Sequence, residues 1–155
     1  MKPKVLLIGD SISMGYTEPT RQILAQRARV ERIPTNGGPT IRGLQHLDEW
    51  LGQMDWDLIH FNFGLHDLKR MDVGQHQVAL NEYRRNLRQI VDRLEHTGAR
   101  LIWAATTPVP EGDVRPPRTD DEVAAYNTVA REIMEERGIP INDLYGRALP
   151  ILDRI

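Results

Sequence analysis

The sequence contains no cysteine, which excludes disulfide bridges, cysteine-ligated metal sites and a cysteine nucleophile. The five histidines form neither an H-x-H nor an H-x-x-x-H pair, so their spacing does not support a metal site. We therefore expect neither a metal ion nor a cofactor.

Long apolar runs and blocks of one charge are also lacking. The apolar run at residues 5–8 is too short for a signal peptide or a membrane span, so we expect a soluble, cytoplasmic protein as the sequence is written. A secretory signal that had already been removed would leave no trace in it. The 20 basic and 22 acidic residues are scattered, and this balance gives no indication of nucleic-acid binding.

Apolar runs alternate with amphipathic stretches along the 155 residues, which suggests one domain, residues 1–155. The pattern predicts strands at residues 5–8, 30–33, 57–63, 100–105 and 139–141, the last with a proline that suits an edge strand. It predicts helices at residues 21–28, 41–51, 78–96 and 121–137, the first capped by Thr17 or Thr20. This alternation predicts an α/β fold, a parallel sheet with helices on both faces.

Small and polar residues follow four of the predicted strands, at residues 9–13, 36–40, 64–67 and 106–110. Functional sites of open parallel sheets gather at the carboxyl ends of the strands. The four loops are therefore expected to converge on one site at one edge of the sheet.

The first of these loops, Gly9-Asp10-Ser11, has two interpretations. Asp10 and Ser11 are good helix-capping residues. Alternatively, Ser11 is a nucleophile, which needs a nearby base and donors aimed at the developing oxyanion. The backbone N–H groups of Ser11 and Gly38 and the ring N–H of a neutral His66 are the candidate donors.

Three short motifs in order resemble those of the SGNH/GDSL hydrolase family. "GDSIS" at 9–13 matches its first block, "NGGPT" at 36–40 its second, and "GLHD" at 64–67 lies where the third reads G-x-N-D. The stretch "AAYNTVAREIMEERGIPINDLY", residues 124–145, is also similar to the late helix and fifth strand of that family. The resemblance covers nearly the whole chain. It implies a three-layer αβα, flavodoxin-like fold with strand order 2-1-3-4-5. It also implies hydrolysis of a small-molecule ester, either an ester of an acetyl or other small acyl group or a lipid ester.

The resemblance also implies roles for single residues. Ser11 stands at the nucleophile position, and Gly38 is the oxyanion glycine, with Gly43 as the alternative. His66 stands where the family has an asparagine, and a neutral imidazole can still donate a hydrogen bond there. A different role for His66, as the base of a dyad with Ser11, stays open. Asp67 is expected to brace the loop rather than to touch substrate.

One part of the family pattern is missing from these residues. The last block, D-x-x-H, follows the fifth strand and supplies the base, but no histidine follows His96 here. We therefore expect a longer natural chain and, in these 155 residues, neither that block nor the final helix, with an apolar patch of the sheet left uncovered. Two functions stay open: a serine esterase that forms a Ser11 acyl-enzyme, or a degenerate domain without hydrolase activity that binds a ligand or a partner. The sequence indicates no oligomeric state.

Overall fold

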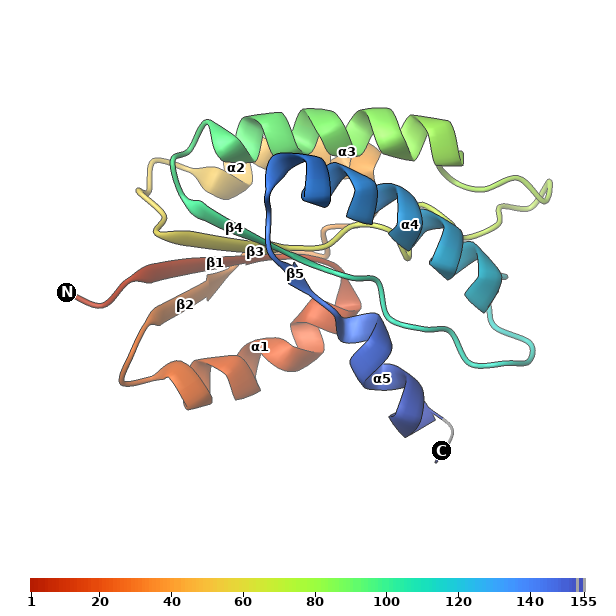
Figure 1. Ribbon diagram of the computed structural model, residues 1–155, viewed down its shortest axis with the longest axis horizontal. Helices are drawn as coiled ribbons and strands as arrows, with labels where there is room; N and C mark the ends of the chain where they lie inside the picture. Colours follow the sequence, from red (N-terminus) through yellow and green to blue (C-terminus); the bar gives the residue numbers. More distant parts are fainter. Residues whose placement is uncertain (153, 155) are drawn as a thin grey trace.

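The structure is a computed structural model that describes residues 1–152 and 154, and it forms a five-stranded parallel sheet flanked by helices (Figure 1). The strand order is β2-β1-β3-β4-β5, which confirms the predicted order. The strands are β1 (Lys4–Ile8), β2 (Arg29–Arg32), β3 (Leu58–Phe61), β4 (Arg100–Ala104) and β5 (Ile141–Asn142). The helices are α1 (Ser11–Leu24), α2 (Thr40–Leu51), α3 (Leu80–Glu95), α4 (Asp120–Arg137) and α5 (Leu144–Leu152).

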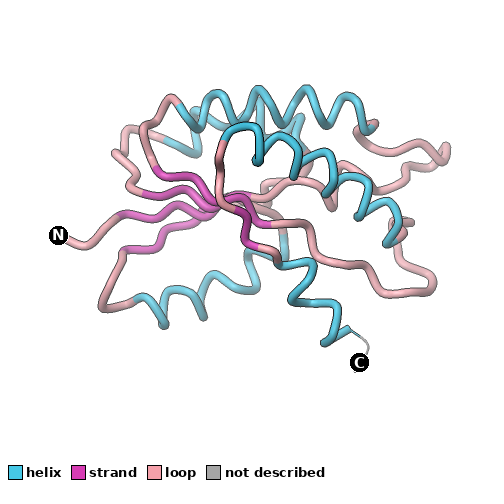
Figure 2. Tube along the Cα trace, in the orientation of Figure 1, coloured by secondary structure: helices cyan, strands magenta, loops and turns pink. Residues whose placement is uncertain are grey.

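Three layers are visible when the sheet is seen on edge. Helices α2, α3 and α4 cover one face, whereas α1 and α5 lie on the other (Figures 1 and 2). Side chains alternate between the two faces along β1, so Leu6 and Ile8 belong to the large core under α2–α4, and Val5 and Leu7 to a smaller cluster on the α1 side. The two faces of the sheet are therefore unequally buried.

The less buried face carries an apolar groove beside α1 and α5, with a volume of about 420 Å³. Its floor is the sheet and its walls are α1 and the start of α5, and its lining residues are Val5, Leu7, Tyr16, Thr20, Leu24, Leu58, His60, Ile102, Asn142 and Leu144.

The first helix begins earlier than the sequence predicted. It starts at Ser11 rather than at residue 21, and Asp10 is its N-cap. Thr17 and Thr20, the predicted caps, lie inside the helix, where their hydroxyls donate to carbonyls one turn back. Glycine and proline are poor helix formers, and the Gly15 and Pro19 of this stretch hid the helix from a periodicity argument.

The chain after α4 also differs from the prediction. Strand β5 comprises Ile141–Asn142 instead of residues 139–141, although it does lie at the edge of the sheet. A further helix, α5, follows it and was not predicted. The carboxylate of Asp143, just before α5, accepts a hydrogen bond from the backbone N–H of Gly146, which is how an N-cap stabilises the first turn.

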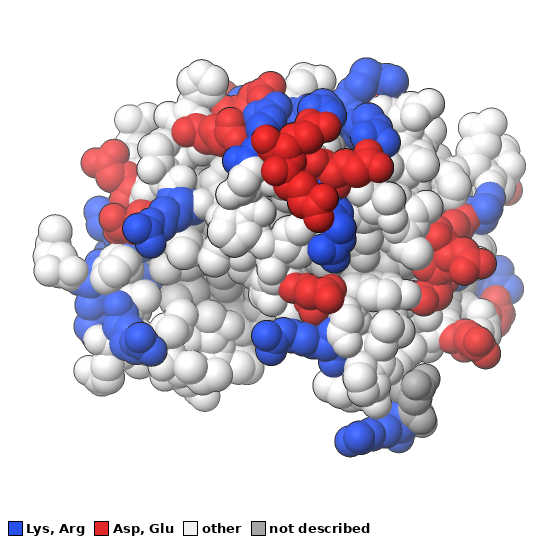
Figure 3. Space-filling model, in the orientation of Figure 1, with Lys and Arg blue, Asp and Glu red and all other residues white. Residues whose placement is uncertain are grey.

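Acidic and basic side chains are intermixed on the surface over α3 and α4 (Figure 3). Pairs between these helices include Arg84 with Glu132 and Arg88 with Glu136. Exposed pairs of this kind contribute little each, so the α3–α4 contact depends on its apolar core. Within the described residues, no helix has the length and apolar character needed to cross a membrane.

Candidate functional site

The carboxyl ends of β2, β1 and β3 are neighbours in the sheet, and the three sequence-predicted site residues follow them. Gly38 lies in the loop after β2, Ser11 directly after β1, and His66 in the turn after β3. The strand order therefore brings their three loops to one edge of the sheet.

Ser11 is the first residue of α1 and is exposed. The carboxylate of the buried Asp10 accepts a hydrogen bond of 2.9 Å from the backbone N–H of Ile12. Because the first N–H groups of a helix have no acceptor within it, the N–H of Ser11 is left at the positive end of the helix dipole. The cap and the exposed serine thus occur together, and the two interpretations of this loop do not exclude each other.

Arg32 in β2 holds the turn that carries Ser11. Its Nη2 donates to the carbonyls of Gly9 and Asp10 at 2.8 and 3.1 Å and to the hydroxyl of Ser13 at 2.6 Å. Burial lowers the pKa of the guanidinium, and the negative charge of Asp10 opposes that shift. The sequence analysis did not identify Arg32 as a site residue. The available signal was a charged side chain within a predicted strand.

The loop after β2 is bound to the loop after β1 through glycines. The N–H of Gly37 donates to the carbonyl of Gly9 at 2.9 Å, and a Cβ at Gly37 would lie only 2.8 Å from that oxygen. Gly38 adopts a left-handed φ of 62°, which favours glycine, and its N–H donates to Oδ1 of Asn36 at 2.9 Å. The candidate oxyanion donor is therefore bonded within its own loop.

Gly43, the alternative to Gly38, lies inside α2. Its N–H donates to the carbonyl of Pro39, and a Cβ there would meet the ring of Phe63 at 2.7 Å. This glycine provides close packing of α2 on the core and has no free N–H for a substrate.

His66 is half-buried, and its ring makes no hydrogen bond with any residue that the structure describes. Burial lowers the pKa of His66, the positive charges of Lys69 and Arg118 act in the same direction, and Asp10 opposes them. The imidazole is therefore neutral at pH 7, with one N–H donor and one acceptor nitrogen.

Asp67 braces two of the loops, as the sequence predicted. It is fully buried, and its Oδ1 accepts hydrogen bonds from the backbone N–H of Thr40 at 2.9 Å and from the Thr40 hydroxyl at 2.5 Å. Asn86 of α3 donates to the same hydroxyl. Burial raises the pKa of Asp67 to about 7, although its bonds to Thr40 act to lower it.

This raised pKa predicts that stability falls with rising pH. Between the ordinary pKa of 3.8 and the folded value of about 7, the unfolded chain ionises Asp67 while the folded chain keeps its proton. Each unit of difference corresponds to about 1.4 kcal/mol, so the group lowers the free energy of unfolding by a few kcal/mol over this range. Asp67→Asn should remove that slope in urea melts from pH 4 to 8. Substitution of the exposed Asp72 by Asn is the control. If Asp67→Asn leaves the slope unchanged, the pH dependence of the free energy of unfolding arises from another group.

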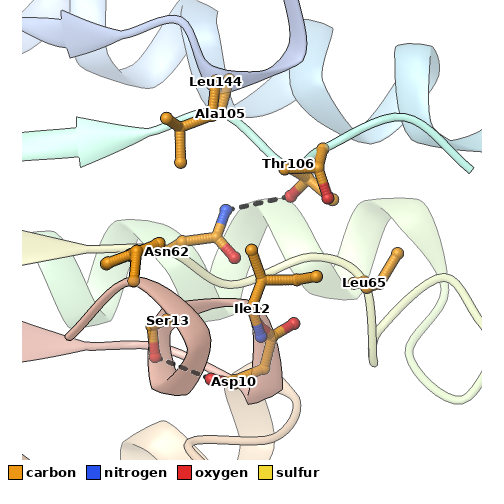
Figure 4. A pocket seen from close by; sticks show the side chains of 10 residues that line it. Asp10, Ile12, Ser13, Asn62, Leu65, Ala105, Thr106 and Leu144 are labelled. Carbon is orange, nitrogen blue, oxygen red and sulfur yellow. Dashed lines mark hydrogen bonds between the residues drawn. The ribbon is translucent and has the colours of Figure 1, made fainter. Parts of the chain in front are cut away.

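A small cavity of about 10 Å³ opens beside the turn that carries Ser11 (Figure 4). Apolar parts of its wall come from Ile12, Leu65, Ala105 and Leu144. Ser11 itself is not among the lining residues, although Asp10 and Ile12 on either side of it are. The cavity shares Tyr16 and Leu144 with the apolar groove, so the two adjoin.

Two polar residues fix the far wall of this cavity and were not predicted as site residues. Asn62, just after β3, donates from Nδ2 to the carbonyl of Ala104 at 2.7 Å and to the hydroxyl of Thr106 at 3.0 Å (Figure 4). Thr106 is held in turn by both amide atoms of Asn127. Only the position of Asn62 could have indicated a site residue, because Asn62 lies between the apolar part of a strand and the "GLHD" loop.

The fold and the position of these loops define a flavodoxin-like α/β protein with a polar site at the carboxyl edge of its sheet. The chain belongs to the GDSL-like lipase/acylhydrolase family, whose model matches residues 7–154. This membership makes it a carboxylic ester hydrolase by class and confirms the resemblance seen in the sequence.

Several solved structures share this fold. The acetyl xylan esterase AlAXEase superposes with a TM-score of 0.82 at 13% identity, over 95% of this chain and 80% of that one. A lipase/acylhydrolase from Enterococcus faecalis gives 0.78 at 21% identity, over 95% and 78%. A catalytic mutant of Axe2, an acetylxylan esterase from Geobacillus stearothermophilus in which an aspartate is replaced by alanine, gives 0.79 at 17% identity, over 100% and 83%. No curated protein matches the chain.

Proposed function

We propose that this chain is a serine esterase that transfers a small acyl group, acetyl in the first instance, from a small-molecule ester to Ser11 and then to water. The observation that carries the proposal is the exposed Ser11 at the N-terminus of α1, directly after β1. Two of the similar folds are named as acetyl xylan esterases, and one structure of Axe2 is a catalytic mutant with a serine replaced.

The reaction uses groups that converge on the carboxyl edge of the sheet. The hydroxyl oxygen of Ser11 attacks the ester carbonyl, its proton passes to a base, and the oxyanion accepts hydrogen bonds from Ser11 N–H, Gly38 N–H and the His66 ring. Collapse of the intermediate expels the alcohol and leaves an acyl-enzyme, which water hydrolyses. For Gly38 to act, its N–H must exchange the Asn36 side chain for the oxyanion.

The size of the cavity supports a small acyl group. A volume of about 10 Å³ corresponds to space for about one water molecule, which is also close to the size of a methyl group. The apolar side chains of Ile12, Leu65 and Ala105 suit that methyl group, and a longer acyl chain would need the adjoining groove.

A second function, binding of an ester without hydrolysis, is favoured by one observation. No described histidine forms a hydrogen bond with Ser11. His66 lies in the turn after β3 at this edge, and it is proposed here as a donor to the oxyanion.

Acylation rates with esters of different chain length distinguish a small acyl group in the cavity, a longer acyl group in the groove, and binding without hydrolysis. We expect p-nitrophenyl acetate to acylate the protein at least about tenfold faster than the octanoate, since burying a chain in a cavity that cannot hold it loses several kcal/mol. Stopped-flow release of nitrophenol at high protein concentration measures the first acylation without requiring rapid turnover. A faster octanoate would assign the acyl group to the groove, and no release from either ester would favour the binding function.

A further inference from the structure

Arg118 lies in the loop between β4 and α4, which leaves the same edge of the sheet as the catalytic loops. The residues on either side of it are fixed. The carbonyl of Pro117 accepts a hydrogen bond of 2.9 Å from the N–H of Arg70, and Thr119 is the N-cap of α4 in a reciprocal capping box with Glu122. The backbone that presents Arg118 is therefore held at both ends.

The guanidinium of Arg118 makes no hydrogen bond and no ion pair with any part of the chain that the structure describes. Its Nε is buried without a partner, although the residue is half-buried overall. Neighbouring Arg70 differs, because it pairs with Glu122 at 2.5 Å. A guanidinium has five N–H donors, and leaving a buried charged donor unbonded is unfavourable, so Nε of Arg118 can gain from an acceptor.

The charge of Arg118 acts on the site itself. Burial lowers the pKa of His66, and the positive charges of Lys69 and Arg118 also lower it. Burial lowers the pKa of Arg118, and the negative charge of Asp10 opposes that shift. The structure describes no ion pair between Asp10 and Arg118. The Asp10 carboxylate accepts a hydrogen bond from the N–H of Ile12. The structure describes no ion pair for Arg118 or Lys69, and both positive charges lower the pKa of His66, the histidine of the proposed oxyanion site.

We propose that Arg118, assisted by Lys69, binds an anionic group, a carboxylate or a phosphate, on the alcohol part of the ester substrate. This specificity rests on the proposed esterase function. The acyl side is excluded because the cavity of about 10 Å³ has an apolar wall and holds only a small group. The planar guanidinium fork matches a carboxylate or phosphate with two parallel hydrogen bonds, and Lys69 adds a second charge.

A matched pair of acetyl esters tests this assignment. 4-Acetoxybenzoate carries an anion on its leaving group, and 4-acetoxybenzamide is its neutral counterpart of the same shape. We expect the anionic ester to have a kcat/KM about tenfold higher or more, the scale of one charge-assisted hydrogen bond. Arg118→Ala should remove most of that preference and leave only the smaller contribution of Lys69, and Arg118→Lys should retain more of it. 4-Acetoxyphenyl phosphate, run beside the benzoate, shows which anion is preferred.

The exposed Arg85 of α3 provides the control for net charge, and Arg85→Ala should leave the ratio unchanged. An equal kcat/KM for both esters in the parent protein, or a ratio that Arg118→Ala does not alter, would overturn the assignment while leaving the esterase function intact.

An equilibrium measurement separates this proposal from catalysis. In the Ser11→Ala variant, titration with 4-hydroxybenzoate and with 4-hydroxybenzamide, followed by NMR, should show tighter binding of the anion, lost in Ser11→Ala/Arg118→Ala and weakened by salt. Preferential anion binding without any hydrolysis by the parent protein would support the cationic site and reject the esterase function. Equal binding of the two probes would reject the cationic site.

Discussion

Replacing Ser11 with alanine should abolish acylation by p-nitrophenyl acetate, with a loss of at least about a thousandfold in rate, because removal of a nucleophile leaves only the oxyanion donors and binding. Ser11 is exposed at the start of α1, so the substitution should leave the fold and the free energy of unfolding almost unchanged. Mass spectrometry of the tryptic digest should locate the acetyl group on the peptide that contains Ser11.

Ser13 is the matched control, because it belongs to the same motif but has a different role. Its hydroxyl is buried, donates to the carbonyl of Asp10 at 2.7 Å and accepts from Arg32. Ser13→Ala should therefore lower the free energy of unfolding by about 1 kcal/mol while reducing acylation much less than Ser11→Ala does. Acylation that survives in Ser11→Ala and disappears in Ser13→Ala would reassign the nucleophile.

The sheet could be predicted from the sequence because its signal is local. Residues 5–8 are continuously apolar, as a strand buried on both faces must be, and the alternation of strands and helices restricts the topology to a parallel sheet. Helix α1 could not be placed correctly, because Gly15 and Pro19 disfavour a helix locally and Asp10, together with hydroxyl bonds from Thr17 and Thr20, stabilises it. Side-chain contacts thus overrode local propensity there.

The site was predictable only as far as loops could be placed at one edge of the sheet. Ser11, Gly38 and His66 could be named as candidates because each follows a strand within a motif. Arg32 was not found, since its role depends on contacts between residues far apart in the sequence, such as the 23 positions that separate Arg32 from Gly9. The bond between Gly38 and Asn36 is likewise a conformational detail that no residue pattern specifies.

His66 is the residue for which two chemical roles remain open, and substitution separates them. As an oxyanion donor, His66→Asn should keep most of the acylation rate, because an asparagine amide supplies an equivalent N–H. His66→Ala should lose about a hundredfold, the usual scale for one oxyanion donor. Rates with p-nitrophenyl acetate are compared at pH 7 and pH 5. Burial lowers the pKa of His66, so the ring should remain a neutral donor to a lower pH than a free histidine would.

The contrasting result identifies a base. If His66 accepts the proton of Ser11, asparagine cannot replace it, and His66→Asn should be as inactive as His66→Ala. The parent rate would then fall as the pH drops through the lowered pKa of His66, because a protonated imidazole has no acceptor nitrogen. Equal acylation by His66→Ala and the parent protein would exclude both roles. In that case the N–H groups of Ser11 and Gly38 would be the remaining donors to the oxyanion.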